Sequence, residues 1–241
     1  MKLQHYLKQS DRLAVALSGG ADSACLLREA AAALGREHVL AITVQTELLP
    51  TRRLRMAKRM AELANVEHII LQAEALEEEG IRNNGTMRDY FYHCLIMRAV
   101  LDEAWVRGCE DIADGLHLDD AQRPAAQAAR ELQIRSPFAE CSMGCFQVAA
   151  LRKGMGEDAA PGEGSLASRL PQGMPLTFEM LSRIDEAEEE LFRLGLVTAR
   201  VVVQGETAAI VVGEAEQERY RTLFDRAHSI AGRTGFQIAT E

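Results

Sequence analysis

The chain has 241 residues, 47% hydrophobic and 26% charged, with a formal net charge of −9 at pH 7, and this length can bury the core of one or two domains. The acidic balance argues against a nucleic-acid surface, which would carry excess positive charge, and favours a small-molecule partner. Because no apolar run could span a bilayer and the first residues lack the apolar core of a signal peptide, we expect a cytoplasmic protein with no membrane partner.

The first predicted element is a strand that leads into a glycine-containing turn. Residues 13–17 are all apolar, and the Ala- and Leu-rich stretch after residue 23 is typical of a helix. The turn between them is Ser-Gly-Gly-Ala-Asp-Ser, residues 18–23. Two glycines let the backbone approach a ligand closely, and the first amides of the helix would face an anion. We therefore predict a phosphate site, with Asp22 tolerated beside phosphate through a bridging Mg²⁺.

An ordinary turn with a helix cap is the alternative interpretation, since Ser, Gly and Asp are favoured there for local reasons. The segment differs from GxxxxGK[ST] and from GxGxxG. It matches SGGxDS, the pyrophosphate-binding loop of the PP-loop ATP pyrophosphatases. This resemblance implies that ATP is cleaved between its α- and β-phosphates, that a substrate oxygen is adenylylated, and that pyrophosphate stays in the loop.

Strands and helices are predicted to alternate over the following hundred residues. Residues 39–44 and 67–71 are predicted to be buried strands, and residues 111–115 are a shorter candidate. Residues 51–64 predict an amphipathic helix, whose basic residues we interpret as a solvated face rather than as phosphate ligands. This order predicts an α/β domain with a parallel sheet, in which ligands bind at the carboxyl ends of the strands.

The last third of the chain predicts a second, smaller α+β domain. A glycine-rich segment over residues 154–164 predicts a mobile loop or linker. The elements expected after it are a helix over residues 177–195 with Thr177 as its N-cap, strands over 199–203 and 208–212, a helix over 215–232 and a strand over 236–238. We therefore expect one domain over residues 1–160 and an αββαβ domain over residues 161–241, with the active site in the cleft between them.

Three further segments resemble the motifs of one family within the PP-loop superfamily. They are Asp-Gly-Leu-His-Leu-Asp-Asp-Ala-Gln-Arg-Pro at residues 114–124, Ile-Arg-Ser-Pro-Phe at 134–138, and Leu-Ala-Ser-Arg-Leu-Pro-Gln-Gly-Met-Pro-Leu-Thr at 166–177. Together with the first loop they resemble the LarE family, whose members carry DGxNxDDxxxxRPG, RSPL and CLASRIPYGTPIT at similar spacing. Members of this family take part in maturation of the nickel-pincer cofactor of lactate racemase. They adenylylate the carboxylates of a pyridinium dicarboxylate mononucleotide with Mg-ATP and then transfer sulfur.

The resemblance implies the fold, the assembly and the roles of individual residues. It implies a Rossmann-like adenine nucleotide α-hydrolase (PP-loop) fold for residues 1–160, a substrate-binding or oligomerisation role for residues 161–241, and a homo-oligomer. The residues that would hold pyrophosphate are Ser18, Gly19, Gly20, Asp22 and Ser23, with Asp22 also holding Mg²⁺. The residues that would line the nucleotide are Asp114, Gly115, Asp119 and Arg123. The candidate catalytic residues near the reacting groups are Asp22, Arg135, Ser168 and Arg169, and Arg200 would bind the substrate phosphate.

These residue types suit the chemistry that the resemblance implies. A carboxylate would lose oxide, a poor leaving group, and adenylylation turns that leaving group into AMP. Guanidinium groups can offset the charge that builds on the α-phosphate in the transition state. The alternative for each arginine is a structural ion pair, most of all for Arg135.

The chain departs from the family pattern at the source of sulfur. In one class of the family a single cysteine donates its sulfur and becomes dehydroalanine, and that position is Ser165 here, whose hydroxyl cannot donate sulfur. In another class an iron–sulfur cluster carries the sulfur. Cys141 and Cys145 stand four residues apart, and Cys94 occupies a family cysteine position, so these three are candidate cluster ligands or a persulfide relay. Cysteines that merely pack in the core are the alternative.

The sequence thus leaves three functions open. The first is an AMP-forming sulfur transferase that draws sulfur from Cys141, Cys145 or a cluster. The second is an amide-forming ligase that uses ammonia as the nucleophile. The third is a nucleotide-binding subunit without turnover, which the substitutions Ser165, Val202 and Gln45 at family positions motivate. Five cysteines without a disulfide-scaffold pattern suit a reducing compartment.

Overall fold

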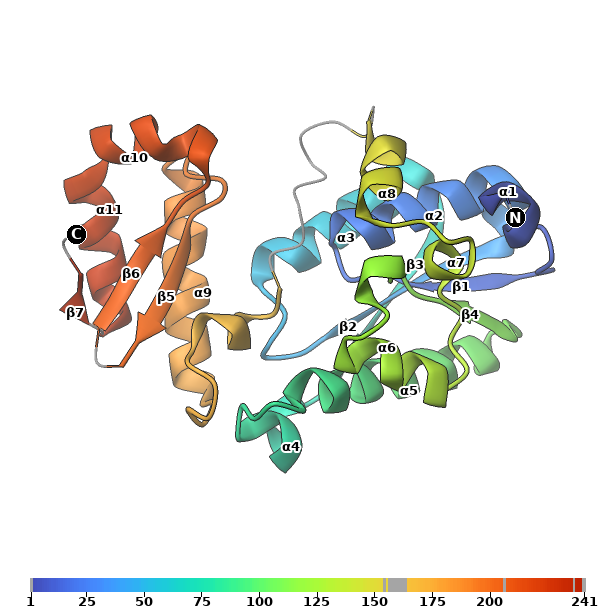
Figure 1. Ribbon diagram of the computed structural model, residues 1–241, viewed down its shortest axis with the longest axis horizontal. Helices are drawn as coiled ribbons and strands as arrows, with labels where there is room; N and C mark the ends of the chain where they lie inside the picture. The colour runs from blue at the N-terminus through green and yellow to red at the C-terminus, as the bar shows by residue number, and fades with distance from the viewer. Residues whose placement is uncertain (1, 154, 156–163, 206, 236, 240–241) are drawn as a thin grey trace. The chain divides into compact units, whose positions relative to one another are not determined.

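The computed structural model describes residues 2–153, 155, 164–205, 207–235 and 237–239 (Figure 1). The glycine-rich segment predicted over residues 154–164 lies outside these residues apart from Met155 and Gly164, and the predicted domain boundary at residue 160 lies outside them too. The chain divides into two compact units. The first consists of Met1–Thr46, Arg53–Glu74 and Asp89–Glu163, and the second of Glu47–Arg52, Ala75–Arg88 and Gly164–Glu241. Two short segments that precede residue 160 therefore belong to the second unit.

A four-stranded parallel sheet lies at the centre of the first unit. Its strands are β1 (Leu13–Ala16), β2 (Val39–Gln45), β3 (Glu67–Gln72) and β4 (Asp111–Ala113), in the order β3-β2-β1-β4. Leu13 of β1 aligns with Val39 on one side and with Asp111 on the other. The strands predicted from the apolar runs are present, and the parallel sheet with its helices confirms the predicted α/β class.

Helices fill the connections of the first unit. They are α1 (Leu3–Leu7), α2 (Ala21–Leu34), α3 (Thr51–Ala64), α5 (Arg88–Val106), α6 (Pro124–Glu131), α7 (Pro137–Glu140) and α8 (Cys145–Arg152), with short 3₁₀ turns η1 (Arg36–His38) and η3 (Leu118–Asp120). The first residues of α3 and α5 belong to the second unit. The amphipathic helix predicted from residue 51 to residue 64 is α3.

The core of the first unit has two layers, one on each face of the sheet. Leu13 and Val15 of β1 belong to a cluster with residues of α2 and α3, whereas Ala14 and Ala16 belong to a cluster with residues of α5. Successive side chains of a strand point to opposite faces. Both faces of β1 are therefore covered, which explains why every residue of this strand is apolar and buried.

The second unit contains a three-stranded sheet of order β5-β6-β7. Its strands are β5 (Arg200–Gln204), β6 (Thr207–Val211) and β7 (Gln237–Ile238); its helices are α4 (Glu79–Arg82), α9 (Phe178–Arg193), α10 (Gln217–Thr222) and α11 (Phe224–Ala231); and its 3₁₀ turns are η2 (Ala75–Glu77), η4 (Leu166–Arg169), η5 (Glu214–Glu216) and η6 (Gly232–Thr234). The predicted hairpin is the antiparallel pair β5 and β6, and β7 runs parallel to β6. Phe236 of the predicted last strand lies outside the described residues.

Two details of the helices in this unit test the sequence-based expectations. Thr177 caps α9 as predicted, because its hydroxyl oxygen accepts a hydrogen bond from the amide of Met180 at 3.3 Å. The single helix predicted over residues 215–232 is wrong, since α10 and α11 are separate. The amide of Leu223 donates to the carbonyls of both Arg219 and Tyr220 at 3.0 Å, which tightens the last turn of α10 and ends it.

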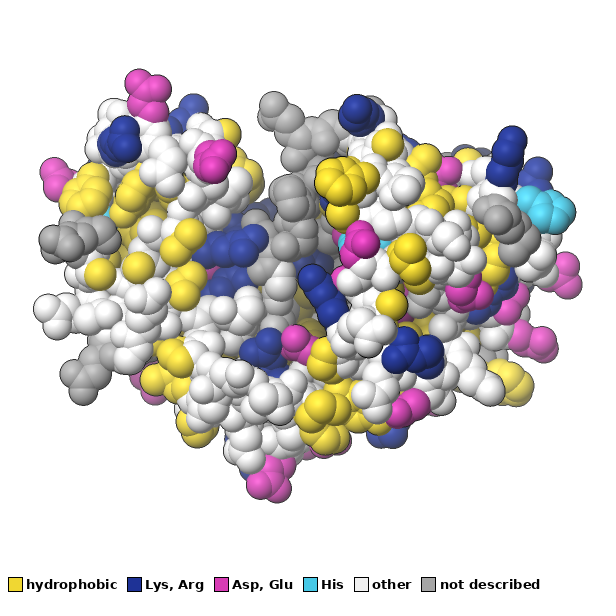
Figure 2. Space-filling view, in the orientation of Figure 1, with side chains coloured by type: hydrophobic (Ala, Val, Ile, Leu, Met, Phe, Trp, Pro, Cys, Tyr) yellow, Lys and Arg dark blue, Asp and Glu magenta, His cyan; other side chains and the backbone are white. Residues whose placement is uncertain are grey.

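None of the helices in the described part of the chain is both long and apolar enough to cross a membrane. Acidic and basic side chains are interspersed over the visible face of the first unit (Figure 2).

Candidate nucleotide site

The turn between β1 and α2 is held by hydrogen bonds among its own residues. The amide of Ser18 donates to Oγ of Ser23 at 3.2 Å, and the hydroxyl of Ser23 donates to the carbonyl of Gly20 at 3.1 Å. The two hydroxyl oxygens of Ser18 and Ser23 lie 3.1 Å apart. Gly19 has φ +70°, in the left-handed region that favours glycine. The turn is thus preformed, and the amino terminus of the 14-residue helix α2 follows it directly.

Arg53 of α3 covers this turn. Its Nε donates to the carbonyl of Ser18 and its Nη2 to the Ser18 hydroxyl, both at 2.9 Å. A Cβ on Gly19 would lie 1.9 Å from the carbonyl oxygen of Arg53, and one on Gly20 would lie 2.8 Å from its guanidinium. Gly19 therefore has no room for a side chain, and a side chain at Gly20 would require the Arg53 guanidinium to move. The guanidinium also places a permanent positive charge at the turn, where the sequence predicts an anion.

The basic residues of α3 therefore do not all form a solvated face, as the sequence analysis expected. Arg55, Lys58 and Arg59 are exposed, but Arg52 is 8% exposed and Arg53 contacts the turn. Sequence reasoning missed Arg53 because helical periodicity predicts on which side of a helix a residue lies, but not which loop that side contacts.

Asp22 lies in the first turn of α2 and is paired with an arginine. Its Oδ1 is 3.4 Å from Nη1 of Arg152 in α8, and its side chain is 32% exposed. Carboxylate oxygens are suitable Mg²⁺ ligands, so a partly exposed carboxylate beside this turn fits the predicted ion. Binding of Mg²⁺ would compete with Arg152 for the same oxygen.

The loop after β4 lies directly against the start of α2. A Cβ on Gly115 would be 2.7 Å from the amide nitrogen of Ser23. Asp114, the residue before it, is 3% exposed, and its Oδ1 accepts hydrogen bonds from the amide of Leu116 at 3.1 Å and from the hydroxyl of Ser136 at 2.8 Å. The structure thus brings Asp114 and Gly115 together with the turn at the carboxyl edge of two paired strands, β1 and β4.

Asp119 lies in η3 and caps α8. Its Oδ2 accepts a hydrogen bond from the amide of Cys145 at 2.6 Å, and this bond holds the pKa of Asp119 below its usual range. Hydrogen bonding to Asp119 in turn raises the pKa of the Cys145 thiol. Arg123 is 72% exposed on its side chain and pairs with Oδ1 of Asp120 at 3.0 Å.

The three candidate cysteines lie on different elements and differ in exposure. Cys141 follows the last residue of α7, Cys145 begins α8, and Ser142 between them has φ +56°. Although Cys141 and Cys145 are four residues apart, they therefore do not lie on one helix. Cys145 is exposed, Cys141 is half-buried and Cys94 is buried in α5. Across the described ranges, no group of three or more His, Cys, Asp or Glu side chains is arranged to hold a metal ion.

Arg135 is not brought together with the turn. Its Nε donates to the hydroxyl of Tyr6 at 2.9 Å, its guanidinium carbon lies 4.4 Å from the centre of the Tyr6 ring, and its Nη1 is 3.2 Å from Oδ2 of Asp111. A further hydrogen bond runs from Nη1 to the hydroxyl of Ser10. Asp111 begins β4 and Ser10 precedes β1, so these contacts lie at the amino edge of the sheet. They favour the structural ion pair that the sequence left as the alternative.

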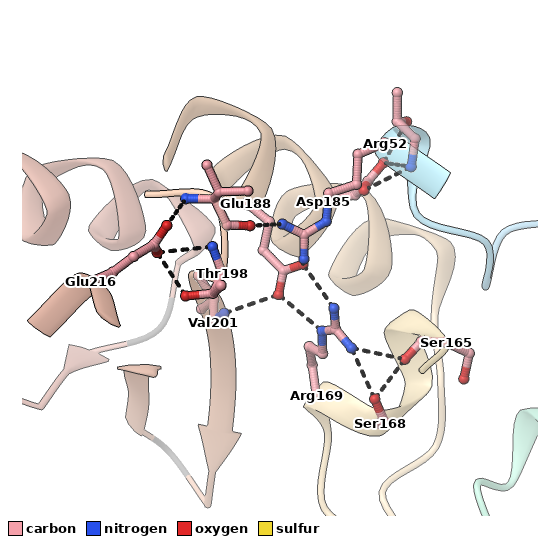
Figure 3. Close-up of polar contacts among 11 residues, drawn as sticks. Arg52, Ser165, Ser168, Arg169, Asp185, Glu188, Thr198, Val201 and Glu216 are labelled. Atoms are coloured by element: carbon pink, nitrogen blue, oxygen red, sulfur yellow. Dashed lines mark hydrogen bonds and ion pairs between the residues drawn. The ribbon is translucent and has the colours of Figure 1, made fainter. Parts of the chain in front are cut away.

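Arg169 of the second unit is held in a buried ion pair (Figure 3). It is 1% exposed, and its Nε and Nη2 donate to the two carboxylate oxygens of Glu188 at 2.9 Å and 3.0 Å. Glu188 also accepts a hydrogen bond from the amide of Val201 at 3.0 Å. Nη2 of Arg52 lies 3.4 Å from Oε2 of Glu188. Sequence reasoning missed Glu188, although an acid on the apolar face of α9 was a usable signal.

The other two candidate residues of this unit lie on η4 and β5. Ser168 is exposed; its hydroxyl donates to the carbonyl of Ser165 at 2.7 Å and accepts from Nη1 of Arg169 at 3.0 Å (Figure 3). Arg200 is the first residue of β5, is half-buried, and aligns with Val211 of β6.

Comparison with known proteins gives three similar chains, although no protein-family profile matches. An uncharacterized protein of Synechocystis is 31% identical over 203 residues, 83% of this chain and 75% of its own length. Pyridinium-3,5-bisthiocarboxylic acid mononucleotide synthase of Lactiplantibacillus plantarum is 30% identical over 240 residues, 97% of this chain and 86% of its own. An uncharacterized protein of Methanocaldococcus jannaschii is 26% identical over 199 residues, 79% of this chain and 75% of its own.

The parallel sheet, the turn after β1 and these similarities define the class, an α/β protein of the PP-loop ATP pyrophosphatase superfamily. Within that class the chain belongs to the LarE family, that of pyridinium-3,5-bisthiocarboxylic acid mononucleotide synthase, with Ser165 at the position of the family cysteine.

Proposed function

We propose that this protein is an ATP-dependent sulfur transferase. It activates a carboxylate of a small-molecule substrate with Mg-ATP, releases pyrophosphate, and then replaces AMP by sulfur. The observation that carries the proposal is the similarity to a bisthiocarboxylic acid mononucleotide synthase over 97% of the chain. The preformed turn of residues 18–23 supports it, because a helix amino terminus with a nearby guanidinium suits a polyphosphate.

The residues around the turn have distinct parts in this proposal. The turn residues Ser18, Gly19, Gly20 and Ser23 hold the β- and γ-phosphates, and Arg53 adds a positive charge. Asp22 holds Mg²⁺, which when bound neutralises phosphate charge. The residues proposed for the rest of the nucleotide are Asp114, Gly115, Asp119 and Arg123. Arg200 is proposed for the substrate phosphate and Ser168 for the reacting groups.

Cys145 is the cysteine that exposure favours as the sulfur carrier. In this proposal an external persulfide donor first loads its sulfur. The terminal sulfur then bonds to the acyl carbon, and the bond from that carbon to the phosphate oxygen breaks as AMP leaves. Two equivalents of a thiol reductant release the thiocarboxylate and restore the Cys145 thiol, forming a disulfide between them.

The test uses the full chain, purified without oxygen and incubated with Mg-ATP, with and without the pyridinium dicarboxylate mononucleotide. We expect AMP and pyrophosphate only when this substrate is present, and a product in which oxygen is exchanged for sulfur once a low-molecular-weight persulfide is added. Cys145→Ala should abolish sulfur transfer but keep pyrophosphate release, while Cys109→Ala, at a buried cysteine, serves as the matched control.

Other products would redirect the assignment. Release of ADP would contradict adenylylation. Exchange of oxygen for nitrogen in the presence of ammonia would favour the amide-forming ligase. ATP that binds without any turnover would favour the non-catalytic subunit that Ser165, Val202 and Gln45 motivate.

A further inference from the structure

His93 and Asp114 form a buried polar pair in the first unit. Nε2 of His93 lies 3.4 Å from Oδ2 of Asp114, and the two side chains are 15% and 4% exposed. Neither of these two atoms has a hydrogen-bond partner among the described residues. The other oxygen of Asp114 is fully engaged, since it accepts from Leu116 and Ser136.

The pair lies at the carboxyl edge of the sheet, where the nucleotide is proposed to bind. Asp114 directly follows β4, and the next residue, Gly115, packs against the amide of Ser23 in the first turn of α2. His93 lies near the start of α5. The hydroxyl of its neighbour Tyr92 is 3.0 Å from Oγ1 of Thr46, the residue after β2.

The arrangement is the one that prepares an imidazole to accept a proton. A buried polar atom without a hydrogen bond keeps an uncompensated desolvation cost, so the missing hydrogen bonds at Nε2 of His93 and Oδ2 of Asp114 are unfavourable for folding alone. A carboxylate that faces one ring nitrogen favours the tautomer with the proton on that nitrogen and leaves the other nitrogen as an acceptor. Such contacts are often long without substrate and shorten in the complex. Nε2 is buried while the His93 side chain as a whole is 15% exposed, so this exposure belongs to its other atoms.

We propose that His93 is the proton acceptor for the nucleophile that displaces AMP, and that Asp114 positions it. This inference rests on the proposed function. The nucleophile carries its proton on sulfur. As a sulfur lone pair forms the bond to the acyl carbon, the bond from that carbon to the phosphate oxygen breaks, its electron pair leaves with AMP, and the proton passes to Nδ1 of His93. The first step needs no such acceptor, because the substrate carboxylate is already ionised at neutral pH.

The test separates the two half-reactions in His93→Gln. Exchange of labelled pyrophosphate into ATP, with the pyridinium dicarboxylate mononucleotide present, reports adenylylation alone. Thiocarboxylate formation after loading with a low-molecular-weight persulfide reports the second step. We expect exchange within about twofold of the wild type and thiocarboxylate formation lowered about 100-fold or more, the usual range for a lost general base. His5→Gln, at an exposed histidine, should change neither rate.

Two further measurements distinguish a chemical role from a structural one. Hydroxylamine should trap more acyl-adenylate from His93→Gln than from the wild type, because the intermediate accumulates. In His93→Ala, added imidazole should restore part of the second step, whereas acetate should not.

Equal loss of both half-reactions in His93→Gln, or loss of neither, would overturn the role of His93. Absence of rescue by imidazole, with exchange retained and no trapped intermediate, would overturn it as well. If the wild-type protein itself shows no exchange, the proposed function fails at its first step, and the assignment of His93 fails with it.

Discussion

Arg53 is the side chain that places a positive charge at the turn of residues 18–23. Its guanidinium donates two hydrogen bonds to Ser18, and a hydrogen bond with a charged group contributes about 1.5–3 kcal/mol. Arg53→Gln should therefore weaken Mg-ATP binding about tenfold, as measured by titration calorimetry. Lys58→Gln, at an exposed position of the same helix, is the matched control. Equal affinities for Arg53→Gln and wild type would show that Arg53 only supports the turn.

Asp119 controls the reactivity of the exposed thiol at Cys145. The carboxylate accepts from the amide of Cys145, and hydrogen bonding to it raises the pKa of the thiol. The thiolate is the reactive form. Asp119→Asn should therefore speed alkylation of Cys145 by iodoacetamide several-fold at pH 8, followed by mass spectrometry of the Cys145 peptide. Glu110→Gln should leave the rate unchanged, and a rate that does not respond to Asp119→Asn would contradict this coupling.

Helix α9 carries the charged centre of the second unit. Leu181, Ile184, Glu188 and Leu191 are all buried and follow a helical spacing, so Glu188 occupies a position where an apolar residue is expected. Its carboxylate faces two buried guanidinium groups, those of Arg169 and Arg52. Removing one member of a buried ion pair leaves an uncompensated charge.

Glu188→Gln should accordingly lower the free energy of unfolding by about 3–5 kcal/mol, measured by urea denaturation. Glu186→Gln, at an exposed position of the same helix, should change it by less than about 0.5 kcal/mol. A change in Glu188→Gln as small as that in Glu186→Gln would mean that the guanidinium groups of Arg169 and Arg52 are compensated elsewhere.

The central sheet contains a half-buried histidine, His68, that should make the stability of the first unit depend on pH. Nε2 of His68 in β3 lies 2.8 Å from Oγ1 of Thr43 in β2, whose hydroxyl donates to the carbonyl of Leu17 at 2.6 Å. Burial, and then the charge of Lys58, lower the pKa of His68 below its usual value of 6.5. The unfolded chain therefore binds more protons than the folded one as the pH falls below this value.

The contribution of His68 to the free energy of unfolding should therefore be constant above about pH 6.5. As the pH falls further, the free energy of unfolding should decrease until the pH reaches the lowered pKa of His68. Urea denaturation between pH 7.5 and pH 5 should give a flatter profile for His68→Gln than for the wild type. His38→Gln should keep the wild-type slope, because His38 lies outside the sheet.

At the scale of the whole chain, the fold could be predicted because its signals are local. The two central strands, β1 and β2, are short and mostly apolar runs, because burial on both faces makes such runs continuous, whereas the edge strand β3 is only partly buried. The Ser-Gly-Gly-Ala-Asp-Ser turn could be predicted for the same reason, since Gly19 has a positive φ and a side chain there would meet the carbonyl oxygen of Arg53.

Side-chain directions across the chain were harder to predict. Arg135 and Ser136 are adjacent in one motif, yet Ser136 donates to Asp114 at the carboxyl edge and Arg135 reaches Asp111 at the amino edge. The backbone of Arg135 pairs with β4, so the side chains of Arg135 and Ser136 point in opposite directions. The sequence motif alone does not show these directions. The contact between Arg53 and the turn joins residues 35 positions apart, which helical periodicity cannot reveal.

The residue type at position 165 bears on how many reaction cycles one molecule can complete. The hydrogen bonds described at this residue run through its carbonyl oxygen, to the Ser168 hydroxyl and the Arg169 guanidinium. Ser165→Cys would keep both. If the family chemistry operates, that variant should complete one turnover without added persulfide, and mass spectrometry should show dehydroalanine at residue 165. An intact cysteine after the reaction would contradict this. A protein with cysteine there is a reagent consumed in equal number with its product, whereas serine leaves the same polypeptide available for repeated use.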